Sequence, residues 1–194
     1  MSSLPTTAPA SNASFTGVAI GLHWLIAIAI IGTFALGLYM HELPLSPQKL
    51  KLYSWHKWAG VTIFLFVLLR LVWRLSHRPP EMPACMPAWQ RKAAKATHVL
   101  LYLLMFAVPL SGWLMSSAKG FQTVWFGVLP LPDLLDKNTE LGDLLQEVHE
   151  LLNFSMAALV VAHLGAALKH HFIDRDDVLA RMLPFLARTT GGIK

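Results

Sequence analysis

Long uninterrupted runs of apolar residues dominate this chain, and short polar connections separate them. Four runs are long enough to cross a bilayer as helices, since a spanning helix needs about 20 mainly apolar residues. They cover residues 17–40, 53–75, 97–117 and 147–172. None of them alternates polar and apolar positions as a membrane β-strand does. The pattern therefore predicts an all-α integral membrane protein built as a four-helix bundle.

The composition agrees with this prediction. Hydrophobic residues make up 55% of the 194 positions, charged residues only 14%, and the mean hydropathy is +0.50. Such a composition is typical of a membrane protein and leaves little chain for a separate soluble domain. We expect one membrane domain over residues 17–184, a disordered N-terminal tail over 1–16 and a short C-terminal tail over 185–194.

Charge predicts the orientation of the bundle. The net charge is +5, and the positive residues gather in the connection between the second and third segments and in the C-terminal tail. The connection before the fourth segment is mainly acidic instead. By the positive-inside rule, we expect both termini and the basic connection to face the cytoplasm. The basic charge is then explained by topology, and we expect no nucleic-acid-binding groove of interleaved basic and aromatic residues, and therefore no nucleic-acid partner.

Four of the nine histidines lie inside the apolar segments at matching depths: His23, His56, His149 and His163. The 14 residues between His149 and His163 bring both to within about 40° of one helix face, about 21 Å apart along the axis. His23 lies about 9 Å and His163 about 13 Å from the cytoplasmic ends of their segments. His56 and His149 each lie within a turn of an external segment start. The depths predict two pairs, His23 with His163 and His56 with His149.

Paired imidazoles inside a membrane predict haem. An ionisable residue within a spanning segment is a candidate functional residue because lipid cannot solvate it, and helix bundles often hold cofactors between facing side chains. Two histidines are common axial ligands of b-type haem, and Gly60, Gly165 and Ala166 near the ligands leave room for a flat macrocycle. Zinc fits less well, because His98 and the adjacent His170 and His171 have no Cys or acidic partner at ligand spacing.

Five motifs resemble those of a known family. They are GLHW at 21–24, SWHKWAG at 54–60, THVLLYLLMFAVPLSGW at 97–113, VHELLNF at 148–154 and AHLGAALKHHF at 162–172. Together they make residues 17–184 similar to the bacterial di-haem cytochrome b561 family, which is related to the b-type membrane subunits of hydrogenases and formate dehydrogenases. The resemblance implies a bacterial inner-membrane protein with two b haems, ligated at His23, His56, His149 and His163. The family includes a superoxide oxidase that reduces ubiquinone, and the small size of this chain is closest to that branch.

Three further residues are candidates for binding roles near the cytoplasmic ends of the helices. His98 and His170 are candidates for a quinone site, because quinone reduction needs hydrogen bonds and protons that imidazole can supply. Arg74 is a candidate partner of a haem propionate. Positive-inside anchoring explains the arginine equally well, and a buried interhelical contact explains His98.

We therefore expect transmembrane electron transfer through two b haems, with superoxide oxidised at the periplasmic face and ubiquinone reduced. Lys49, Lys51 and Lys57 near the outer histidines would attract an anion, although ordinary solvation also accounts for them. The alternative is a b-type electron-transfer subunit of a hydrogenase or another periplasmic dehydrogenase, with a periplasmic redox protein as the donor. A membrane scaffold without cofactor is disfavoured by the cost of four intramembrane histidines.

The charge distribution gives a testable topology. A reporter that works only in the cytoplasm should be active when it is fused after Lys194, and a reporter that works only in the periplasm should be inactive there. The reason is that positively charged segments are disfavoured for translocation across the membrane. A fusion within residues 121–135, where the acidic connection lies, should give the opposite pattern. A C-terminal fusion that is active only in the periplasm would show that the bundle is inverted.

Overall fold

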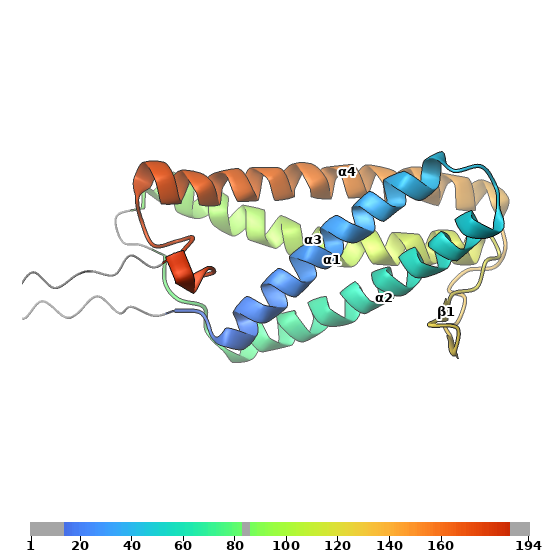
Figure 1. The fold of residues 1–194 in the computed structure, drawn as a ribbon, viewed down its shortest axis with the longest axis horizontal. Helices are drawn as coiled ribbons and strands as arrows, with labels where there is room; N and C mark the ends of the chain where they lie inside the picture. Colours follow the sequence, from blue (N-terminus) through green and yellow to red (C-terminus); the bar gives the residue numbers. More distant parts are fainter. Residues whose placement is uncertain (1–13, 83–85, 187–194) are drawn as a thin grey trace, which may run out of the picture.

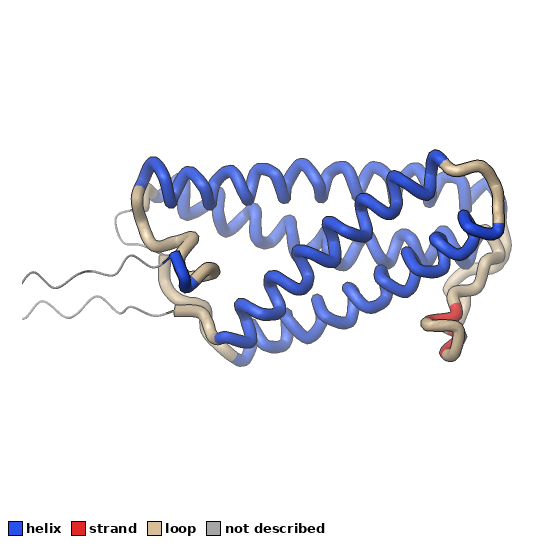
Figure 2. The backbone as a smooth tube through the Cα atoms, viewed as in Figure 1, coloured by secondary structure: helices blue, strands red, loops and turns tan. Residues whose placement is uncertain are grey.

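The structure is a computed structural model that describes residues 14–82 and 86–186, so most of the two predicted tails lies outside the described residues. Four long helices run side by side: α1 (Gly17–Glu42), α2 (Pro47–Ser76), α3 (Ala88–Ala118) and α4 (Thr139–Lys169) (Figure 1). A two-stranded antiparallel hairpin, β1 (Val124–Trp125) and β2 (Leu129–Pro130), lies between α3 and α4 in the chain. It is at one end of the bundle (Figure 2). A π-helical turn, η1 (His170–Asp174), follows α4, and a 3₁₀ turn, η2 (Pro184–Leu186), lies farther along the chain.

Polar residues mark where three of the helices begin. The Thr16 hydroxyl accepts the Ala19 amide at 3.3 Å, the Ser46 hydroxyl accepts the Lys49 amide at 3.2 Å, and the Asn138 side-chain oxygen accepts the Leu141 amide at 3.0 Å. Each satisfies an amide that the first helical turn leaves without a partner. Pro47 strengthens the start of α2, because proline at the first helical position lacks the hydrogen that would go unpaired there.

The prediction of an all-α membrane bundle is confirmed, but three helices are longer than predicted. All four helices, with the fourth continuing to Asp174, are long and apolar enough to span a bilayer. However, α2, α3 and α4 begin at residues 47, 88 and 139, well before the predicted 53, 97 and 147. Hydropathy detects only the part of a helix that lies in hydrocarbon, whereas the caps and the polar first turns extend it.

The longer helices correct one expectation about the outer histidines. His56 lies nine residues after the start of α2, and His149 lies ten residues after the start of α4, so neither is within the first turn. Both helices begin before their apolar segments by a similar number of residues, so His56 and His149 still lie at matching depths. The two rings face each other as predicted, although each histidine lies deeper in its helix than the apolar segment alone indicates.

The helices pack in sequence order, α1 on α2, α2 on α3 and α3 on α4. Backbone contact of α4 with α1 or α2 is sparse by comparison. A small core around Ile26, Ile63 and Val67 joins α1 to α2, and Met105 and Phe106 of α3 pack against it. Most other apolar side chains point outward, as shown by Val161, which is 70% exposed. A bilayer would cover these side chains, so the bundle uses lipid where a soluble protein uses a second layer.

The hairpin lies against the end of α2. The Trp58 indole donates to the Val124 carbonyl at 2.6 Å, and the Trp125 indole donates to the Thr62 hydroxyl at 3.3 Å. The opposite end of the bundle carries the first and last described residues together with the α2–α3 connection (Figure 1). The segments with excess positive charge thus lie at one end and the acidic connection at the other, as a single orientation in the membrane requires.

Candidate haem centres

The structure brings the four intramembrane histidines together in two pairs. His56 of α2 faces His149 of α4, with ring centroids 6.3 Å apart and ring planes at 80°. His23 of α1 faces His163 of α4, with centroids also 6.3 Å apart and planes at 75°. We call these the outer pair, at the hairpin end, and the inner pair, at the end with the first and last described residues. One helix, α4, contributes to both.

The spacing within each pair suits one metal ion between two imidazoles. An imidazole nitrogen binds a metal at about 2 Å and lies about 1 Å from its own ring centre. Two rings on opposite sides of one metal ion therefore have centroids roughly 6 Å apart. The two pairs match this distance independently, on helices that make little direct contact with one another. The residues present fit haem iron, which the facing histidines of a pair would hold and which would supply one-electron redox chemistry.

Hydrogen bonds fix the ring of His149 in the outer pair. Its Nδ1 lies 3.0 Å from the Val108 carbonyl oxygen and 2.9 Å from the Ser111 hydroxyl, which itself donates to Val108 at 2.8 Å. Because a carbonyl can only accept, Nδ1 carries the hydrogen. Nε2 then keeps its lone pair, which is the state a metal-binding imidazole needs. This support on α3 was missed by the sequence analysis.

The other member of the outer pair, His56, is incompletely satisfied. Its Nδ1 is buried and has no hydrogen-bond partner among the residues that the structure describes. His56 and His149 both line a cavity to which all four helices contribute, including Thr33, Pro109 and Asn153. Leaving a buried polar nitrogen unpaired is costly in a finished protein core. Nδ1 lies beside α1, 3.7 Å from a Cβ atom built at Gly37, so the feature that fits a bound group is the cavity that His56 shares with His149.

Two glycines make room for the outer rings. A Cβ atom at Gly37 would lie 3.2 Å from Cε1 of His56, and a Cβ atom at Gly112 would lie 3.0 Å from Cε1 of His149. Both distances are closer than such contacts normally allow. Gly112 therefore lets the His149 ring lie against α3. Of the small residues singled out by sequence, Gly60 lines the outer cavity, whereas Gly165 and Ala166 are exposed.

A third imidazole stands beside the inner pair. The His98 ring of α3 lies 5.4 Å from the His163 ring, at 70° to it. This separation is shorter than the 6.3 Å of the two facing pairs, and the contact is edge-on. On the other side of the site, the Arg70 guanidinium donates to the Ala19 carbonyl at 3.0 Å, one turn before His23. The inner pair thus has a titratable neighbour and a positive charge close by.

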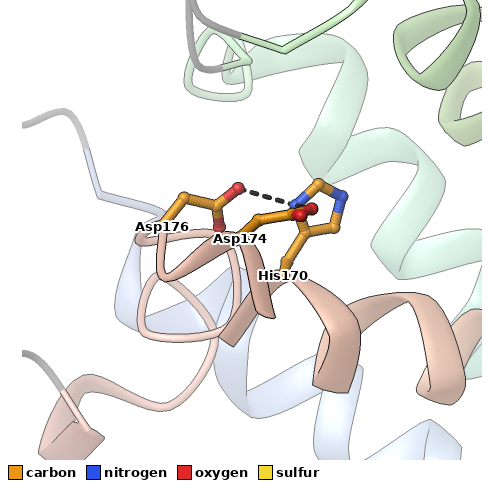
Figure 3. Close-up of side chains that lie close together, drawn as sticks. All are labelled: His170, Asp174 and Asp176. Atoms are coloured by element: carbon orange, nitrogen blue, oxygen red, sulfur yellow. Dashed lines mark hydrogen bonds and ion pairs between the residues drawn. The ribbon is translucent and has the colours of Figure 1, made fainter. Parts of the chain in front are cut away.

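His170 lies in a charged cluster at the end of α4 (Figure 3). Its Nδ1 is 2.6 Å from Asp176 and 3.3 Å from Asp174, so the expectation that it lacks an acidic neighbour is wrong. The i,i+4 spacing of Asp174 could have predicted its contact, whereas the contact with Asp176 forms because η1 and the left-handed Arg175 turn the chain back on itself. The three side chains are close enough to share a cation. However, the Lys169 ammonium already pairs with Asp174 at 2.6 Å, which makes the cluster an ion-pair network.

Arg74, the predicted propionate partner, is exposed near the same end of the bundle. Its guanidinium lies 5.5 Å from the centre of the Tyr102 ring of α3. Among the described residues, it forms no salt bridge with any carboxylate. No hydrogen bond joins His98 to His170 within this part of the chain either, so the two quinone candidates are separate groups.

Comparison with known proteins identifies the architecture. The family model described as prokaryotic cytochrome b561 matches residues 14–185 of this chain. The chain belongs to the prokaryotic cytochrome b561 family. It is accordingly an integral inner-membrane protein with several spanning helices that binds b-type haem and transfers electrons across the membrane, which confirms the predicted family, fold and location.

Similar proteins cover nearly the same length. Cytochrome b561 homolog 2 of Escherichia coli is 39% identical over 168 residues, which are 86% of this chain and 89% of that protein. Cytochrome b561 homolog 1 of the same organism is 32% identical over 173 residues, 88% and 97% of the two chains. A probable superoxide oxidase of Yersinia pestis is 29% identical over 167 residues, 85% and 93% of the two chains.

The two outer glycines lead to a test of haem binding. Gly37→Ala and Gly112→Ala should both lower the ratio of haem to protein, because the added methyl group displaces a histidine ring and overpacking of this kind costs about 1–3 kcal/mol. The loss should be larger for Gly112→Ala, where the contact is shorter. Haem is measured from the Soret absorbance of purified protein. Gly32→Ala on α1 is the matched control, since nothing lies within 4 Å of its added Cβ. An equal loss in all three variants would mean that the methyl groups act on helix packing in general.

Proposed function

We propose that this protein oxidises superoxide at the periplasmic face of the inner membrane and reduces ubiquinone near the cytoplasmic face. The observation that supports it best is the pair of histidine sites with equal 6.3 Å spacing, one toward each end of the bundle and both served by α4. The haems supply one-electron redox chemistry at these two sites. Sequence similarity adds support, because a relative from Yersinia pestis that is 29% identical to this chain is described as a probable superoxide oxidase.

The reaction sets different demands on the two faces. Two superoxide anions give two molecules of dioxygen and release two electrons. One ubiquinone takes up these two electrons and two protons to form ubiquinol. Superoxide oxidation thus needs a path for a small anion but no proton donor, whereas quinone reduction needs titratable side chains that exchange protons with water.

We assign His56 and His149 to the outer haem and His23 and His163 to the inner haem. The Val108 carbonyl and the Ser111 hydroxyl hold His149 in the tautomer that presents Nε2 to the metal. Arg70 and Arg74 are our candidates to pair with propionates of the inner haem. Arg70 is half-buried and Arg74 is exposed, so the two differ in how far they reach into the bundle.

We assign the quinone site to the neighbourhood of His98, with His170 as a second candidate. His98 is 5.4 Å from His163, so a molecule bound beside His98 would be close to the inner centre. His170 has its Nδ1 held by Asp176 at 2.6 Å, which leaves Nε2 as its free nitrogen. Imidazole can exchange protons, which quinone reduction requires.

Three lysines give the outer end a local positive charge that would attract superoxide. The Lys57 ammonium donates to the Phe121 carbonyl at 2.9 Å, the Lys49 ammonium donates to the Leu43 carbonyl at 2.5 Å, and the Lys51 ammonium lies 5.1 Å from the Trp55 ring centre. Neutral carbonyls and aromatic rings hold these groups in place, and Asp133 of the acidic connection offsets part of the charge of Lys57. A fixed positive field raises the local concentration of an anion.

The alternative function, a b-type electron-transfer subunit for a periplasmic dehydrogenase, is favoured by one feature. The hairpin exposes apolar side chains, including Phe126 at 57% and Val128 at 83%. Exposed apolar patches often mark partner surfaces. Stopped-flow measurements separate the two functions: the purified single chain should be reduced by superoxide within milliseconds and reoxidised by a ubiquinone analogue. Slow reduction by superoxide, together with co-purification of a large periplasmic protein, would favour the alternative.

Removal of an outer histidine should remove one haem of two. His56→Ala and His149→Ala should each bind about half of the normal haem, because bis-histidine ligation needs both imidazoles. The remaining haem should keep its spectrum. His41→Ala is the control, since this histidine is exposed near the same end of α1. Full haem content in both outer variants would disprove the assignment.

Removal of His98 should affect the quinone and spare the haems. In His98→Ala, haem content and reduction by superoxide should stay normal, while reoxidation by the quinone analogue should slow by about 10²-fold, the usual effect of losing a proton-transfer group. Loss of the inner haem would instead make His98 a ligand and would contradict the pairing of His23 with His163. A normal haem content and a normal rate of reoxidation would show that His98 acts only in packing.

A further inference from the structure

A basic groove opens at the inner end of the bundle, where α1 begins and α2 ends. Its walls come from the start of α1, the end of α2 and Tyr102 of α3, and it contains the side chains of Arg70, Arg74, His77 and Arg78. Arg74, His77 and Arg78 are exposed, so the charged part of the groove faces outward. We propose that this groove binds the headgroup of an anionic phospholipid from the adjacent leaflet.

The arginines of the groove have no carboxylate partner in the part of the chain that the structure describes. Residues 1–13, 83–85 and 187–194 contain no Asp or Glu, so no acidic side chain from these segments can supply the missing charge. If two haem propionates pair with Arg70 and Arg74, Arg78 still has no anion. A phosphate group is the anion that the surrounding membrane supplies in this position.

The walls of the groove are built for the membrane interface. The Trp73 indole donates to the Thr16 hydroxyl at 2.9 Å, which fixes α2 to the start of α1. The His77 ring stacks flat on the Trp73 ring, with centroids 4.0 Å apart and planes at 8°. Tryptophan at this level is typical of the headgroup region. The stack gives the groove a rigid side beside two cationic groups, His77 when it is protonated and Arg78.

Apolar side chains next to the groove suit acyl chains. Val72 is 62% exposed and Leu75 is 78% exposed on the same two turns of α2. Phe15 and Pro79 also line the groove. Basic pockets beside spanning helices on the cytoplasmic side commonly bind anionic lipid headgroups, and the combination of guanidinium groups with apolar neighbours matches both parts of such a lipid. A free phosphate ion would use only the charged part.

Native mass spectrometry of the purified haem protein tests the proposal. After incubation with equal amounts of phosphatidylglycerol and phosphatidylcholine, the unmodified protein should retain one phosphatidylglycerol in preference to phosphatidylcholine. Arg78→Gln should lower this retention by about fivefold, the effect expected for one arginine near an anionic headgroup. Lys92→Gln is the matched control, because Lys92 is an exposed positive residue near the start of α3, outside the groove. It should retain the lipid normally.

Each contrary result overturns the proposal in a different way. Equal retention of the two lipids by the unmodified protein would show that the groove does not select an anionic headgroup. Equal losses in Arg78→Gln and Lys92→Gln would show a general attraction to the basic end. Displacement of the lipid by inorganic phosphate alone would identify a site for the free ion. The Soret absorbance of Arg78→Gln should be normal, and if that variant does not fold, the lipid preference of the unmodified protein still decides the question.

Discussion

The cost of placing imidazoles in hydrocarbon is the constraint on which the rest of this structure depends. A histidine within a spanning helix cannot be hydrated, so it must face a partner inside the bundle. His149 and His163 are both on α4, and the helical repeat brings them to nearly the same face. Their partners must then come from α2 and α1, at heights set by the connections. The arrangement of the four helices follows from bringing these rings to 6.3 Å in both places.

The space around the pairs follows from the same requirement. The backbone of α4 packs closely on α3 but only sparsely on α1 and α2, the two helices that carry its histidine partners. A cavity therefore remains where the outer rings meet, lined by side chains of all four helices. Gly37 and Gly112 let the two outer rings lie close to α1 and α3. Helix contact and cofactor space are thus divided between different pairs of helices.

Charged side chains also make the two ends of the bundle different from each other. The inner end combines His98 beside His163, the His170 ion-pair network and a groove that contains three arginines. The outer end has lysines held on backbone carbonyls and an acidic connection. Proton exchange and contact with anionic lipid headgroups suit the first environment, and entry of a small anion suits the second. The two ends are therefore chemically distinct although the helices between them are uniformly apolar.

The sequence by itself determined the four helices, their family and the pairing of the histidines, because hydropathy and helical period are local properties of the chain. Only the tertiary structure decided the details that join distant segments. The Val108 and Ser111 support of His149 crosses 38 residues or more, and the contact of Gly112 with the same ring depends on how α3 approaches α4. The Asp176 partner of His170 required the π-helical turn and the left-handed Arg175, which no periodicity predicts. The basic groove likewise exists only because Trp73 fixes the end of α2 to Thr16 at the start of α1, and the relative placement of separate helices is set by packing between them.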